Sequence, residues 1–153
     1  MFEAHEVEAR KFVGQVAAEM NQPEDHQTVM RVMTSVFHAI RDVITVEESL
    51  HLIAQLPLYI KGLYVTEWHL GEKKKMKDKD DFIESLLLKN DKTGALDFGT
   101  DEKALTRTKA VIKVLKRKVS PGLIEKLIAQ FPADLKDLWY EDAVAGSPAK
   151  SIL

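Results

Sequence analysis

The sequence predicts an all-α protein, a helical bundle made of two tandem repeats of about four helices each, related by a pseudo-two-fold axis. The first observation is a hexapeptide that occurs twice: Leu-Ile-Ala-Gln-Leu-Pro at 52–57 returns as Leu-Ile-Ala-Gln-Phe-Pro at 127–132, 75 positions later. Such a near-identity indicates an internal duplication. The second is that apolar residues recur every three or four positions, which is typical of amphipathic helices. The third is that no stretch shows the alternation of a half-buried strand.

Each half is predicted to begin with an amphipathic helix. The first spans residues 5–20 and is stopped by Asn21-Gln22-Pro23. The second begins where Asp80 or Asp81 can act as the N-cap. Both helices carry apolar residues at the same spacing, so that Phe12 corresponds to Phe82: Phe12, Val13, Val16 and Ala17 in the first, and Phe82, Ile83, Leu86 and Leu87 in the second.

The second helix of each half is expected at 26–43 and at 101–118. Here Val29 corresponds to Ala104, a larger offset than that from Phe12 to Phe82, so the second half has gained residues in the loop at 92–99. Loops take insertions at little cost in free energy. The change of offset therefore agrees with a duplication in which one loop became longer.

The third helix of each half should begin at an N-cap, Thr45 or Ser120, and end before a proline, Pro57 or Pro132. Glu48 stands three residues after Thr45, where a capping box has its acid. Proline lacks an N–H, and its ring clashes with the carbonyl four residues back. Each proline should therefore break the helix and start a short last helix, at 57–65 and at 132–141.

Two glutamines, Gln55 and Gln130, are the members of the hexapeptide that packing does not explain. We expect them to cap the turn that follows or to bridge the two copies across the pseudo-axis. Loss of the Gln55 side chain should then lower stability by roughly 1 kcal/mol, the usual scale for a lost cap.

The two copies are expected to form one domain at 1–145, because a unit of about 65–70 residues buries little core alone. Repeat one covers about 5–68, a polar linker 69–80, and repeat two about 81–142. Residues 146–153 are small and polar, and we expect a flexible tail there.

Composition excludes several classes of protein. The chain has no cysteine, which rules out disulfides, thiol catalysis and cysteine-bound metals and fits the reducing cytoplasm. The N-terminus lacks the order of a signal peptide, and no apolar run approaches the ~20 residues of a membrane span. We therefore expect a soluble cytoplasmic protein without a membrane partner. A formal charge of −2 gives no general argument for nucleic acid.

The repeated pattern resembles a known family. The hexapeptide at 52–57 is followed by Ile60-Lys61-Gly62-Leu63-Tyr64 and Trp68, and its second copy is followed by Leu135-Lys136-Asp137-Leu138-Trp139. This arrangement is similar to that of the bacterial domain-of-unknown-function family 2267, and the resemblance covers about residues 5–142. It implies a small bacterial helical protein, duplicated inside, with no agreed activity and no catalytic or binding residues to carry over.

No catalytic or metal-binding arrangement stands out, so we expect neither an enzyme nor a cofactor. No two histidines have the three- or four-residue spacing of helical metal ligands. The densest group of acids and histidine is Glu67, His69 and Glu72, and a solvated helix end explains it better than a metal site.

The sharpest functional hint is a basic helix at 103–118, which has no acidic residue. Such a face can neutralise phosphates, so binding of nucleic acid or another polyanion is one hypothesis. Pairing with acids of the first half, which has 5 Lys and Arg against 10 Asp and Glu through residue 68, is the other. The candidate polyanion-binding residues are Lys103, Arg107, Lys109, Lys113, Lys116 and Arg117.

Aromatic residues gather at the ends of the two short helices: Tyr59, Tyr64, Trp68, Trp139 and Tyr140, of which the last four are the candidate groove residues. They could line a groove between the copies that binds a peptide or a small apolar ligand, or they could fill the core. Of the two, we expect the aromatic residues to fill the shared core. The leading hypothesis is a non-enzymatic helical module that acts through an unknown protein partner or through self-association. Polyanion binding and ligand binding in the groove remain alternatives.

Overall fold

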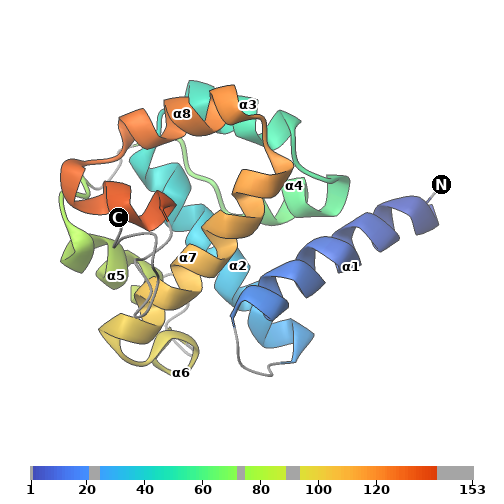
Figure 1. Cartoon of the computed structure of the whole chain (residues 1–153), viewed down its shortest axis with the longest axis horizontal. Coiled ribbons are helices and arrows are strands. Elements are labelled where there is room, and N and C mark those ends of the chain that lie inside the picture. The colour runs from blue at the N-terminus through green and yellow to red at the C-terminus, as the bar shows by residue number, and fades with distance from the viewer. Residues whose placement is uncertain (1, 21–24, 72–74, 89–93, 141–153) are drawn as a thin grey trace, which may run out of the picture.

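The protein is all-α, as predicted. The computed structural model describes residues 2–20, 25–71, 75–88 and 94–140, and within these ranges there is no strand (Figure 1). The described helices, in chain order, are α1 (Phe2–Glu19), α2 (His26–Val43), α3 (Val46–Ala54), α4 (Leu58–Val65), α5 (Lys79–Leu88), α6 (Gly94–Phe98), α7 (Asp101–Lys118), α8 (Pro121–Gln130) and the 3₁₀ helix η1 (Ala133–Trp139).

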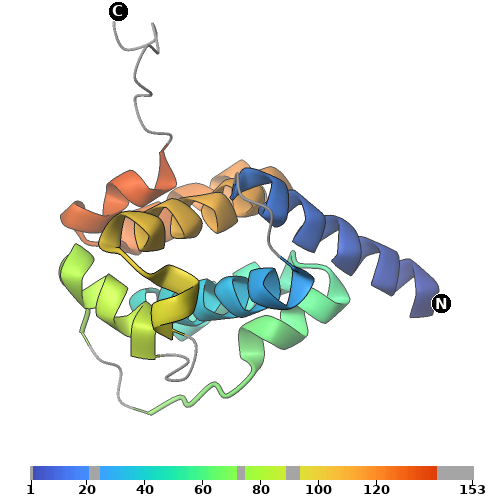
Figure 2. The same ribbon diagram turned by 90° about the horizontal axis from the view of Figure 1, so that it is seen from below.

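Two long helices, α2 and α7, lie at the centre and contact each other. Figure 2 shows α7 and η1 in an upper layer and α2 in a lower one. Helices α1 and α5 each contact both α2 and α7. The N-terminal turns of α1 extend beyond the bundle (Figures 1 and 2).

A single hydrophobic core joins the two halves of the chain. Apolar residues of α2 and α7 form its centre, because residues three and four apart fall on one face of a helix. These residues are fully or almost fully buried: Val29, Val32, Met33, Val36, Phe37 and Ile40 from α2, and Ala104, Val111, Ile112, Val114 and Leu115 from α7.

The helix starts correct two expectations about caps. Thr45 caps α3 as predicted, its side chain accepting a hydrogen bond from the Glu48 N–H at 3.2 Å. Ser120 makes no such bond to the first turn of α8. At α5 the capping side chain is neither Asp80 nor Asp81: Asp78 accepts from the Asp81 N–H at 2.9 Å, one residue before the helix begins.

The described end of the loop expected at 92–99 forms a helix, α6, which the sequence did not predict. A Cβ at Gly94 would lie 2.4 Å from the backbone oxygen of Leu87, so only glycine fits where α6 meets α5. Asp97 is buried and accepts two hydrogen bonds from Arg31 of α2, at 3.0 and 3.1 Å. Tertiary contacts of this kind, rather than local propensity, stabilise a helix as short as α6.

Candidate functional site

The paired glutamines connect the two halves of the chain. Helix α3 contacts α8, and both lie at the top of Figure 1. Gln55, just after α3, accepts a hydrogen bond from the Ser120 N–H at 2.7 Å and donates to the Ser120 hydroxyl at 3.1 Å. Gln130, at the end of α8, accepts from the Thr45 N–H at 2.8 Å. Of the two roles expected for the glutamines, the structure shows the bridge.

These bonds explain why the capping box at Thr45 is incomplete. In a capping box the acid three residues on would accept from the N–H of the cap residue. Here Gln130 of the other half accepts from that N–H, and Glu48 accepts from His51 instead, at 2.8 Å. Each end of α3 is thus held by the opposite end of α8, so the two helices run antiparallel.

Arg41 of α2 is a buried cation that sequence reasoning did not single out. Its guanidinium donates hydrogen bonds to three backbone carbonyl oxygens. One is that of Tyr64 in the last turn of α4, at 2.5 Å, and the other two follow the helix, Thr66 at 2.8 Å and Glu67 at 2.9 Å. It also lies 5.7 Å from the centre of the Trp68 ring, a cation–π distance. Burial lowers the pKa of Arg41 from its ordinary value.

Lys116 of α7 makes a similar contact, with one backbone carbonyl instead of three. It donates to the backbone oxygen of Trp139 at 2.5 Å. Under the offset that relates the two hexapeptides, Lys116 corresponds to Arg41 and Trp139 corresponds to Tyr64. In both halves, therefore, a cation near the end of the long helix holds the end of the last short helix. This shared spacing is the signal that could have identified Arg41 from the sequence.

The candidate polyanion-binding residues do not share one open face. Arg107 is only 3% exposed and donates to the backbone oxygen of Asp97 at 3.0 Å, so it lies in the interior. Lys113 and Arg117 both contact the Glu19 carboxylate of α1, Lys113 at 3.3 Å. Lys103 and Lys109 are half-buried, and Lys116 holds the Trp139 carbonyl. Several of the cations therefore have partners within the chain.

Glu19 is the acid of the first half that meets this helix. The hydrogen bond from Arg117 is the main cause that lowers the pKa of Glu19, with a smaller contribution from Lys113. A lowered pKa in the folded state means that this contact stabilises the fold above the ordinary pKa of glutamate and is lost as the pH falls through the lowered value. The contact therefore belongs to the fold at neutral pH.

The aromatic residues form two separate clusters rather than one groove. Tyr64 is buried. Its ring packs edge-on against Trp68, with ring centres 6.0 Å apart, and at a tilt against Phe37, with ring centres 5.8 Å apart. Trp139 is buried and packs against Phe131 at 5.2 Å. Within the described part of the chain, no ring contact joins the Tyr64 cluster to Trp139 or to Tyr140, which is exposed. Burial raises the pKa of the Tyr64 hydroxyl, which forms a 2.6 Å hydrogen bond with Ser49.

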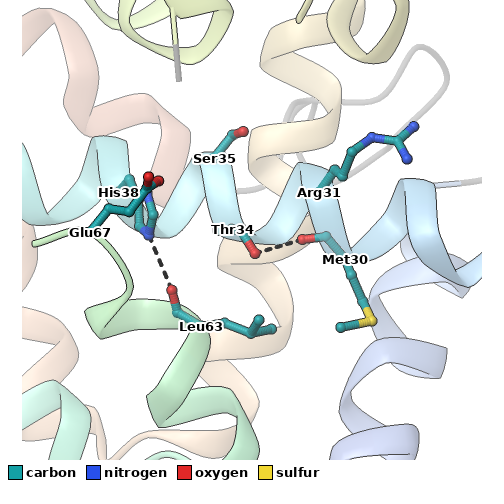
Figure 3. A pocket seen from close by; sticks show the side chains of 7 residues that line it. All are labelled: Met30, Arg31, Thr34, Ser35, His38, Leu63 and Glu67. Atoms are coloured by element: carbon teal, nitrogen blue, oxygen red, sulfur yellow. Dashed lines mark hydrogen bonds between the residues drawn. The ribbon is translucent and has the colours of Figure 1, made fainter. Parts of the chain in front are cut away.

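A pocket of about 230 Å³ opens between α2 and the end of α4 (Figure 3). His38 forms a hydrogen bond through Nε2 with the Leu63 carbonyl at 3.1 Å, and Thr34 donates to the Met30 carbonyl at 2.8 Å. Glu67 has a positive φ of 51°, which is uncommon for a residue other than glycine. The residues lining the pocket are Met30, Arg31, Thr34, Ser35, His38, Leu63 and Glu67.

The metal hypothesis gains no support from the described residues, in which no group of three or more His, Asp and Glu side chains is placed to hold an ion. Of the sequence cluster, Glu67 and His69 are described and Glu72 lies outside the described residues. The same part of the chain contains no helix with the length and hydropathy of a membrane span.

Exposed apolar side chains are distributed unequally over the two halves. In the first half they include Leu50 of α3, 57% exposed, and Leu58 and Tyr59 of α4, 49% and 45% exposed. The residues 75 positions later are Glu125, Ala133 and Asp134, which are exposed too. These pairs of residues, 75 positions apart, are therefore apolar in the first half and small or acidic in the second.

Comparison with known proteins gives a family and no activity. No curated protein matches the chain. A family model described as "Uncharacterized conserved protein (DUF2267)" matches residues 9–138, from within α1 to the end of η1. Because this match covers most of the chain, the protein belongs to the DUF2267 family.

Proposed function

We propose that this protein is a non-enzymatic, cytoplasmic helical module that acts by contact with another protein, through exposed apolar residues of α3 and α4. The proposal rests on one observation: Leu50, Leu58 and Tyr59 are apolar and exposed, whereas the residues 75 positions later are Glu, Ala and Asp. A single exposed apolar side chain is common and needs no explanation. Here, however, the second half has equivalent helices with Glu, Ala or Asp at these positions, so the fold itself does not require apolar residues there.

The comparison depends on a second part of the proposal, that the chain is an internal duplication with a pseudo-two-fold axis and a helix break at each proline. Several pairs of features that share the offset of the hexapeptide support it. Helices α2 and α7 have 18 residues each and begin after Asp25 and Thr100, whose side chains cap them. Pro57 and Pro132 precede α4 and η1. The bridges made by Gln55 and Gln130, and the clamps made by Arg41 and Lys116, have the same spacing.

The charged contacts of α7 also favour the exposed apolar residues of α3 and α4, rather than the basic helix, as the interaction surface. Lys113 and Arg117 meet Glu19, and Arg107 is buried, so polyanion binding by this helix would have to compete with contacts inside the chain. The apolar residues of α3 and α4 have no such competitor, because they are exposed to solvent. Helices α3 and α4 pack against each other, and contiguous exposed apolar patches mark interaction sites.

A photo-crosslinking amino acid placed at Tyr59 tests this proposal, with the same amino acid at Asp134 as the matched control. In cells that naturally contain the protein, illumination of the Tyr59 variant should give one adduct of discrete mass, and the Asp134 variant should give none. An adduct of twice the chain mass would identify self-association.

Equal adducts at both positions, or none at Tyr59, would contradict the proposal. Retention of the purified protein on heparin at physiological salt, with no adduct at Tyr59, would favour the polyanion alternative, because phosphate-type binding depends strongly on salt.

A further inference from the structure

We draw no further inference here: the strongest candidate, the open pocket of about 230 Å³ between α2 and the end of α4, carries nothing because its lining mixes apolar, acidic and basic side chains and no contact among the described residues selects one class of ligand.

Discussion

Arg41→Met should lower the free energy of unfolding by about 3 kcal/mol, because three carbonyl oxygens near the end of α4 lose a charged donor inside the protein. Methionine keeps much of the length and apolar volume of the arginine stem, so the loss reports the hydrogen bonds rather than a cavity. Chemical denaturation with a matched m-value is the appropriate measurement.

Lys116→Met is the internal control for that experiment. Lys116 is exposed and donates to one carbonyl, that of Trp139, where Arg41 donates to three. Its loss should cost about 1 kcal/mol. Equal losses for the two variants would show that burial and the number of acceptors do not decide the stability of these clamps.

Replacing both bridging glutamines, as Gln55→Ala with Gln130→Ala, should cost about 2 kcal/mol, roughly 1 kcal/mol for each N–H left without its acceptor. The two bonds lie at opposite ends of α3, so their effects should add. Thermal or urea unfolding of the single and double variants measures both the size and the additivity. Gln27→Ala, at an exposed position in the first turn of α2, should stay within about 0.5 kcal/mol of the parent protein. No loss in the double variant would exclude a stabilising role for the glutamine bridge.

The parts of the fold that the sequence predicted are those set by local patterns. The bounds of α2 and α7 agree with the expected 26–43 and 101–118, because an apolar stripe and a capping residue are both visible along the chain. Thr45 as the N-cap of α3 follows from the same kind of reasoning. For Gln55 and Gln130 the sequence left two roles open, a cap or a bridge, and only their contacts with Ser120 and Thr45 distinguish them.

The parts that it missed depend on contacts between distant residues. Helix α6 forms where Gly94 fits against Leu87 and where Asp97 meets Arg31, 66 residues away in the sequence. For the basic helix at 103–118 the sequence left two hypotheses open, polyanion binding and pairing with acids of the first half, but it did not identify the acid: Glu19 reaches Arg117 from α1, 98 residues away. Neither contact can be predicted from the spacing of residues along one helix.

The candidate sites, too, were predictable only where they depend on local patterns in the sequence. The aromatic residues were expected either in a groove or in the core, and burial of Tyr64 and Trp139 agrees with the core. The pocket at Glu67 could not be predicted, because it joins the middle of α2 to the end of α4 and depends on a left-handed residue. The sequence already contained the difference between Leu50, Leu58 and Tyr59 and the residues 75 positions later. Only the structure shows that these three side chains are exposed and could therefore contact a partner.

The most direct measurement for the central claim is made on one variant in which these three residues receive their counterparts from the second half: Leu50→Glu, Leu58→Ala and Tyr59→Asp. The free energy of unfolding should stay within about 1 kcal/mol of the parent protein, because exposed positions contribute little. The molar mass over a concentration series and the amount of a co-purified partner, both measured beside the parent protein, should show that association is lost. A folded variant that keeps its association would contradict the claim that α3 and α4 carry the interaction.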